Sequence, residues 1–231
     1  MPIMARWANR WGIVGERKRE EGGREVKEKS LEEFISGLGS SSPTPGGGAA
    51  AALAGAMAAA LVGMVAELAA RRGEECTRVI AMAGELREEL LSLAQRDSEA
   101  YDRVDAALKL PKSTPEETEA RRKALQTALR GAAEVPLRTA ALSREVLALA
   151  REFLPRCPKS ARSDLASAGA LALAAVRAAL YNVDANCLAI KDRQFLARMA
   201  RERSAIAEGA AAAATALRES LEPELQRWLP S

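Results

Sequence analysis

The feature that most constrains this chain is a run without any charged residue, from Ser40 to Ala66, in which "SPTPGGG" leads into "AAAALAGAMAAALVGMVA". Alanine is the strongest helix former and is depleted in β-strands. The run therefore predicts one long helix, from about Gly46 to Arg72. The two prolines and three glycines before it predict a stiffened loop that ends at an unshielded helix start.

On length alone this helix is long enough to cross a membrane. Its side chains are mostly those of alanine and glycine, however, and such a helix gains little from lipid. Gly55, Ala59 and Gly63 recur every fourth residue on one face, which favours close approach of a neighbouring helix. We therefore expect a central helix buried among protein helices, with no membrane span.

The rest of the chain also reads as helix. Aromatic residues make up only 3% of the 231 residues, and no stretch alternates as a strand does. Capping residues and prolines predict further helices over 31–38, 75–108, 115–153, 163–190 and 192–220. The predicted fold class is all-α, an antiparallel bundle of about five to six helices.

The net charge of +3 comes from the first 29 residues, which hold eight Lys/Arg and five Asp/Glu and leave 26 of each for the other 202. Equal numbers of acidic and basic residues in these 202 residues argue against a nucleic-acid partner. We expect residues 1–29 to be a flexible basic tail and 30–231 to be a single helical domain. An arm that binds a partner through Trp7 and Trp11 is the alternative for the tail.

The chain has no histidine and three widely spaced cysteines, Cys76, Cys157 and Cys187. Histidine-dependent catalysis and histidine-ligated zinc are thereby excluded, and the cysteines predict neither a metal site nor a disulfide framework. Acid–base chemistry must then use Asp, Glu, Lys, Tyr or Cys. We expect a cytoplasmic protein, without a metal.

The glycines Gly46 to Gly48 are the first candidate site. Glycines at a helix start leave backbone N–H groups accessible, and with the helix dipole these bind an anion or a carbonyl oxygen. The spacing matches neither a P-loop nor a dinucleotide fingerprint. A simple turn is the alternative interpretation.

Two acidic clusters are further candidates. Asp97, Tyr101 and Asp105 are spaced four residues apart and so share one helix face, which is either a solvated stripe or part of a site. Ser163 and Asp164 stand at a predicted helix start, where capping and the helix dipole alone could explain both.

Asn182 and Asn186 lie four residues apart on an otherwise apolar helix. Buried amides need hydrogen-bond partners. These two either bind a neighbouring helix or hydrogen-bond the edge of a heterocyclic ligand.

In order along the chain, "SPTPGGG", "LPKSTPEE", "EVPL", "RSDL" and "NVDAN" resemble the cyclodeaminase domain of formiminotransferase-cyclodeaminase, a family that includes stand-alone bacterial methenyltetrahydrofolate cyclohydrolases. The likeness covers about Leu31 to Leu217. It implies a dimeric helical bundle, a tetrahydrofolate derivative as substrate, and no tightly bound cofactor. The family has serine after the glycine triplet, where this chain has Ala49.

The resemblance implies formiminotetrahydrofolate cyclodeaminase activity; the alternatives are methenyltetrahydrofolate cyclohydrolase, a folate-binding protein without turnover, and a helical scaffold. Asp164 is expected to stabilise charge or act as base, with Asp97 and Tyr101 orienting groups or moving protons. The residues expected to bind substrate are Thr44, Gly46, Gly47, Gly48, Arg121, Arg162, Ser163, Asn182 and Asn186.

Overall fold

The computed structural model describes residues 26–228. Its α-helices are α2 (Leu31–Leu38), α3 (Gly47–Ala70), α4 (Thr77–Lys109), α5 (Pro115–Phe153), α6 (Arg162–Cys187) and α7 (Arg193–Leu225). Short 3-10 turns are η1 (Val26–Glu28), η2 (Leu154–Arg156) and η3 (Lys159–Ala161). No strand occurs between residues 26 and 228. The all-α fold class is confirmed.

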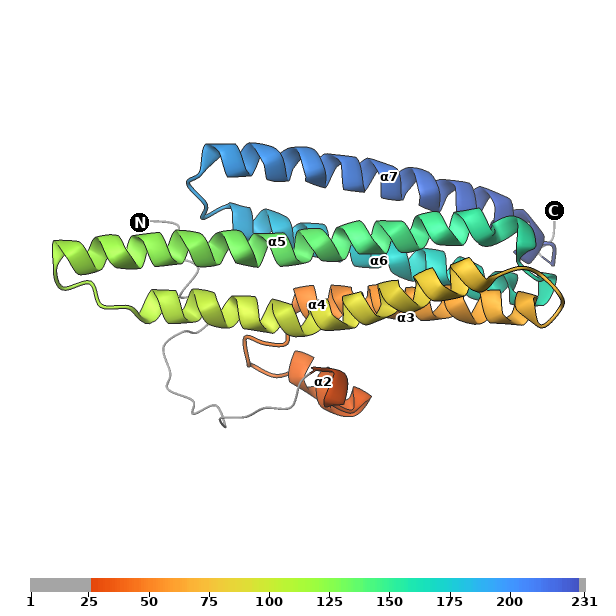
Figure 1. Ribbon diagram of the computed structural model, residues 1–231, viewed down its shortest axis with the longest axis horizontal. Coiled ribbons are helices and arrows are strands. Elements are labelled where there is room, and N and C mark those ends of the chain that lie inside the picture. Colours follow the sequence, from red (N-terminus) through yellow and green to blue (C-terminus); the bar gives the residue numbers. More distant parts are fainter. Residues whose placement is uncertain (1–25, 229–231) are drawn as a thin grey trace.

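Five long helices, α3 to α7, run along the long axis of the molecule, and the short α2 lies to one side (Figure 1). Helix α3 packs against α4, α5 and α6, while α7 packs on α5 and α6. The alanine-rich α3 is thus packed among three other long helices, as its composition predicts, while α5 contacts all four of the others. Apolar windows long enough to cross a membrane occur in α3 and in Lys159–Cys187, but 56% and 44% of these windows, respectively, are buried inside the bundle.

Small residues on α3 explain this close packing. A Cβ added to Gly55 would lie 2.6 Å from the Ser143 hydroxyl and 3.2 Å from a Leu90 methyl. Only glycine allows α5 and α4 to approach α3 this closely here. At Gly63 the same atom would make an ordinary 3.5 Å contact with Ala83, so glycine is not required there.

The helix ends follow the local sequence except at α6. Ser30 and Thr114 form capping boxes with Glu33 and Glu117. The expectation that Ser163 caps α6 is wrong, because the N-cap is Ala161, two residues earlier, and Ser163 lies within the first turn of the helix. That helix ends at Cys187, three residues before the predicted end.

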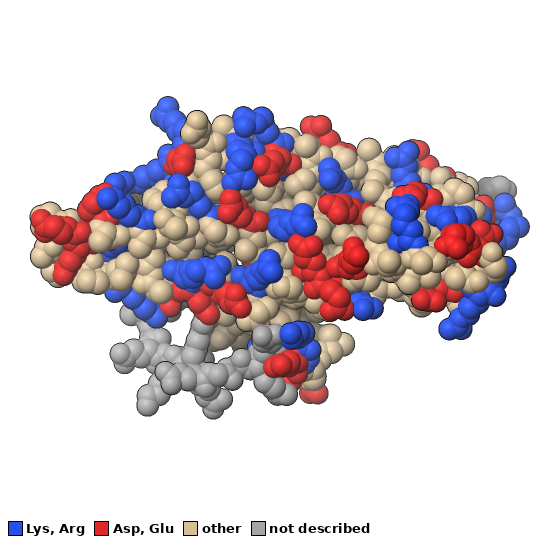
Figure 2. All heavy atoms as spheres, viewed as in Figure 1, with Lys and Arg blue, Asp and Glu red and all other residues tan. Residues whose placement is uncertain are grey.

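Acidic and basic side chains are interspersed over the face drawn in Figure 2, with no single-sign field of the kind that nucleic-acid binding favours. Val26 is buried against α4, and its N–H donates to the Gln95 side chain at 3.0 Å. Residues 1–25, with Trp7 and Trp11, lie outside the described residues, so the predicted tail stays a prediction.

Candidate functional site

A cavity of about 400 Å³ lies among α3, α4, α5 and α6, and is also bordered by the end of α2 and by two connecting segments. Its wall combines the loop before α3, the first turn of α3, the second half of α4, the first half of α5 and the end of α6. Cavities of this size hold small ligands. The sequence places its glycine triplet, one acidic residue and two asparagines on this one wall: Gly46, Gly47, Gly48, Asp97, Asn182 and Asn186 all line it.

The carboxylate of Asp97, from α4, reaches the start of α3. The N-cap of α3 is Gly46, which has no side chain to satisfy the first N–H groups of the helix. Instead, the Ala49 N–H donates to the Asp97 Oδ2 atom at 3.0 Å. The α4 side chain therefore performs the capping that the glycines cannot.

Glycine at position 48 is required for this arrangement. A Cβ added to Gly48 would lie 2.1 Å from the Asp97 Oδ1 atom and 2.5 Å from its Cγ. Any side chain there would displace the carboxylate. The glycine triplet therefore lets the Asp97 carboxylate lie against the backbone at the start of α3, and it is not merely a flexible turn.

Burial raises the pKa of Asp97 from its ordinary value of 3.8 to about 6, although the hydrogen bond from the Ala49 N–H opposes this shift. A carboxyl group with a pKa close to neutrality takes up and releases protons readily at physiological pH. Asp97 is therefore the best acid–base candidate in the cavity.

Two backbone donors of α3 remain beside Asp97. Gly47 and Gly48 line the cavity, and first-turn N–H groups have no carbonyl partner within their own helix. A Cβ on Gly47 would lie 3.2 Å from the Asn182 side-chain nitrogen. This end of the cavity thus combines a carboxylate, backbone donors and an amide.

The two asparagines are each held by one backbone carbonyl. Asn182 donates from Nδ2 to Ala178 of its own helix at 2.9 Å, and Asn186 donates to Ala132 of α5 at 2.7 Å. An amide has two N–H donors and a carbonyl oxygen. Each side chain thus keeps hydrogen-bonding capacity while lining the cavity, so both interpretations of this pair remain open.

The carbonyl that holds Asn186 is available because of Pro136. Proline has no N–H, so Pro136 cannot donate to the carbonyl four residues earlier, which is that of Ala132. Asn186 donates to this carbonyl from the neighbouring helix. The helical hydrogen-bond rule applied to "EVPL" points to this carbonyl, a signal that the sequence interpretation missed.

Most of the cavity wall is apolar and was also missed. Thr44 and Tyr101 line the cavity as expected, but so do Leu38, Val104, Leu108, Leu125, Leu129 and Leu188. Leucine and valine at helical spacing look the same in a sequence whether they face a core or a cavity. Asp105, on the same face as Asp97, instead pairs with Lys109 at 2.8 Å.

Four predicted residues lie away from the cavity wall. Asp164 is in the first turn of α6, eighteen residues before Asn182, which corresponds to about 27 Å of helix. Arg162 pairs with Glu224 of α7, and Ser163 is in the same first turn. Within one chain, the expectation that these three share a site with the glycines is not met. Their expected roles stay predictions.

Arg121 also has a structural partner. Its guanidinium donates twice to the Leu108 carbonyl, at 3.2 and 2.8 Å, which ties the end of α4 to the start of α5. The three cysteines are unpaired. Among residues 26–228, no group of three or more Cys, Asp or Glu side chains could hold a metal ion.

Comparison with known proteins identifies the family of this chain. The sequence profile described as Formiminotransferase-cyclodeaminase matches residues 30–205. This chain belongs to the formiminotransferase-cyclodeaminase family. It resembles the methenyltetrahydrofolate cyclohydrolase of Methylorubrum extorquens, with 39% identity over 84% of this chain and 94% of that protein.

One solved relative has the same fold, and another relative is a much longer protein. The solved formiminotetrahydrofolate cyclodeaminase of Thermotoga maritima superposes with a TM-score of 0.78 at 29% identity, over 87% of this chain and all of that one. The formimidoyltransferase-cyclodeaminase of Gallus gallus is 34% identical over 72% of this chain but only 32% of its own length. All these relatives are named as enzymes, and this family member is an enzyme as well.

Proposed function

We propose that this protein is a methenyltetrahydrofolate cyclohydrolase, which adds water to the 5,10-methenyl cation of tetrahydrofolate and opens the ring. The observation that carries the proposal is the buried Asp97 carboxylate at the glycine-rich start of α3. The choice of reaction is supported by 39% identity to a methenyltetrahydrofolate cyclohydrolase across 94% of that enzyme.

The reaction needs a base beside a delocalised cation. Water attacks the methenyl carbon and loses one proton to the base. The remaining hydroxyl proton passes to N5 as the bond from that carbon to N5 breaks, and a formyl group stays on N10. We assign the proton to Asp97, whose pKa of about 6 lets it accept one near neutral pH and release it afterwards. Its ionised form also favours the cationic substrate.

The cavity wall suits the two ends of such a substrate. We assign the Gly47 and Gly48 N–H groups and the Asn182 amide to polar atoms of the folate ring system, because they surround Asp97. Leu125, Leu129 and the apolar residues near them would then contact the flat benzoyl portion. We also assign Tyr101, which lines the cavity one helical turn after Asp97, to relaying protons.

Formiminotetrahydrofolate cyclodeaminase is the second candidate and the first expectation from the sequence. In that reaction N10 attacks the carbon of the protonated formimino group, the N10 proton passes to the formimino nitrogen, and ammonia leaves as the bond from that nitrogen to the carbon breaks. The specific support is the Thermotoga maritima cyclodeaminase structure, which superposes over its whole length on 87% of this chain. The same carboxylate would serve both reactions, because both have the methenyl cation as reactant or product.

Two assays on one preparation separate these functions. We expect the near-ultraviolet band of 5,10-methenyltetrahydrofolate to decay faster with enzyme than in buffer, and expect no ammonia from 5-formiminotetrahydrofolate. Ammonia release without enhanced ring opening would support the cyclodeaminase. Binding without either reaction would contradict the enzymatic proposal for both.

We also propose a homodimer, formed through the face that α3 and α6 share. Met57 and Met64 of α3 are 45% and 40% exposed, and the exposed residues of α6 include Ser167, Ala170 and Ala174. From Met57 to Met64 on α3 and from Ser163 to Ala174 on α6 no exposed residue is charged, which suits a helix–helix interface. Light scattering should give twice the 24.6 kDa chain mass.

A matched pair of variants tests this interface. Ala174→Glu should produce monomers, since it places a charge on the shared face. Ala211→Glu, on the exposed side of α7, should leave the mass unchanged. A monomeric wild-type protein would contradict the dimer. We further propose a cytoplasmic enzyme that acts without a tightly bound cofactor, consistent with three unpaired cysteines.

A further inference from the structure

The short connection between α6 and α7 forms one edge of the cavity. Its first two residues, Leu188 and Ala189, line the cavity, and Leu188 is 71% exposed. An apolar side chain this exposed gains little where it stands. It would gain contact area when a ligand fills the cavity beside it.

One side chain of α5 holds this connection by two hydrogen bonds. The Gln126 Nε2 atom donates to the Ala189 carbonyl at 3.0 Å, and its Oε1 atom accepts from the Lys191 N–H at 2.8 Å. A planar amide that donates and accepts at once fixes both the position and the orientation of the backbone it binds. Leu125, the residue before Gln126, lies on the cavity wall.

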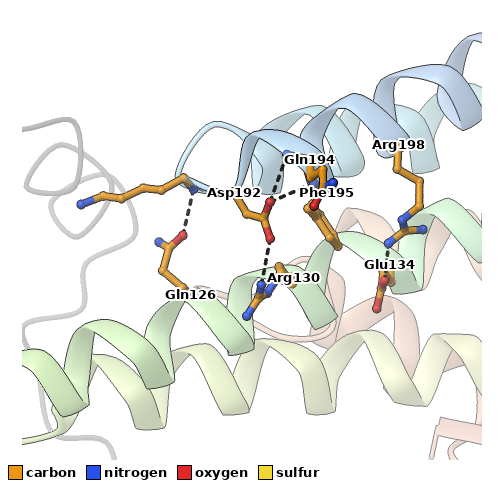
Figure 3. Close-up of polar contacts among 8 residues, drawn as sticks. Gln126, Arg130, Glu134, Asp192, Gln194, Phe195 and Arg198 are labelled. Atoms are coloured by element: carbon orange, nitrogen blue, oxygen red, sulfur yellow. Dashed lines mark hydrogen bonds and ion pairs between the residues drawn. The ribbon is translucent and has the colours of Figure 1, made fainter.

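A second contact holds the end of the same connection. The Arg130 guanidinium, one turn after Gln126, lies 3.1 Å from the Asp192 carboxylate. Asp192 also accepts from the Gln194 and Phe195 N–H groups, at 3.0 Å each, and so caps α7. Figure 3 shows Gln126 and Arg130 reaching from α5 toward this connection.

The same view contains a contact that serves as a comparison. Arg198 of α7 pairs with Glu134 of α5 at 2.6 Å, about a turn beyond Arg130 (Figure 3). It joins the same two helices, but neither residue lines the cavity, and Arg198 otherwise contacts Glu202 and the Phe195 ring of its own helix. Loss of this pair tests how much the α5–α7 contact matters without disturbing the cavity edge.

We propose that Gln126 is a positioning residue for the substrate of the proposed folate reaction. It fixes the backbone of Ala189 and Lys191, so that Leu188 stands where it covers the apolar portion of the bound substrate. Gln126 acts through Leu188 and does not touch the reacting atoms, which lie by Asp97. The proposal rests on the proposed function.

Gln126→Met keeps the length of the side chain and removes both hydrogen bonds. We expect KM for 5,10-methenyltetrahydrofolate to rise about tenfold while kcat stays within twofold, because substrate covering is lost and Asp97 is unchanged. Arg198→Met is the matched control and should leave both constants within twofold. An unchanged KM in the Gln126 variant would overturn the proposal.

A double-mutant cycle identifies the side chain through which Gln126 acts. Leu188→Ala should also raise KM, and the double variant should be no worse than Leu188→Ala alone. Effects on KM that multiply would mean that Gln126 acts elsewhere, and would contradict the assignment.

A measurement without substrate separates failure of this inference from failure of the proposed function. Hydrogen exchange of the Lys191 amide should become at least tenfold faster in Gln126→Met and stay unchanged in Arg198→Met. Unchanged Lys191 exchange would overturn the positioning role, whatever reaction the wild-type enzyme catalyses. If exchange accelerates but neither folate reaction occurs, only the proposed function fails.

Discussion

The first turns of α3 and α6 both look like candidate sites in the sequence, but only the first turn of α3 borders the cavity. Both begin without a capping side chain of their own, and the sequence makes both candidates for a site. At α3, the carboxylate of Asp97 arrives from another helix and borders a cavity. At α6, Asp164 belongs to the helix itself, and the adjacent Arg162 pairs with Glu224.

The difference shows what makes a helix start available for chemistry. The acidic residue of α6 is favoured there by its own helix dipole, which needs no ligand to explain it. The carboxylate at α3 is brought into a buried place where its pKa rises to about 6. Burial of a carboxylate that raises its pKa in this way is typical of an active site. Four substitutions test this comparison, in order of decreasing effect.

Asp97→Asn should have the largest effect on catalysis. The amide keeps the shape and can still accept from the Ala49 N–H, but it cannot take a proton. We expect kcat for methenyl ring opening to fall about 10³-fold, within the range for loss of a general base. A loss below tenfold would remove Asp97 from the proposed mechanism.

The same substitution should stabilise the fold at high pH. Between its ordinary pKa of 3.8 and its folded pKa of about 6, the folded protein keeps a proton on Asp97 that the unfolded chain has released. Wild-type stability is therefore lost as pH rises through this window. Urea unfolding should show Asp97→Asn to be more stable than wild type at pH 8, by up to about 3 kcal/mol, with little difference near pH 3.5.

Gly48→Ala should be the next most damaging change. The added Cβ would overlap the Asp97 carboxylate, so the carboxylate must move, and we expect kcat/KM to fall about 10²-fold. Gly63→Ala is the matched control on the same helix, since its Cβ meets Ala83 at an ordinary distance. Steady-state rates near wild type for both variants would mean that the close approach is irrelevant to catalysis.

Pro136→Ala tests the second contact between helices at the cavity. The new N–H would bond to the Ala132 carbonyl and compete with Asn186, so we expect KM to rise about fivefold with kcat nearly unchanged. Pro223→Ala, in α7, removes another proline from within a helix and should leave KM unaltered. Equal KM values in both variants would show that substrate binding does not depend on the hydrogen bond between Asn186 and the Ala132 carbonyl.

Asp164→Asn should have the smallest effect. If the active cavity lies at the start of α3, this change should lower kcat/KM less than threefold. A loss as large as that of Asp97→Asn would reverse the comparison. It would show that the start of α6 completes a site, which within a dimer would mean the site of the second chain.

The helices themselves follow from local sequence. Alanine content, the two capping boxes and the position of Pro115 predict both ends of five of the six α-helices to within a few residues. These signals succeed because they act within one or two turns. The start of α6 lies two residues before the one that a Ser163 cap predicts, since Ser163 has the chemistry of a cap but not its position. Helix position and four-residue spacing also single out the glycines, Asp97 and the asparagines one by one, whereas only the family likeness implies that they share a site.

What the sequence by itself determined is therefore the set of helices and the residue types available for acid–base chemistry. Only the tertiary structure decided that Asp97 meets the N–H of Ala49, 48 residues away along the chain, and that Asp164 does not. It also decided which leucines face a cavity and that Gln126 holds its edge. The physical reason is that hydrogen bonds within a helix depend on neighbours in sequence, whereas burial and contacts between helices depend on how whole helices pack.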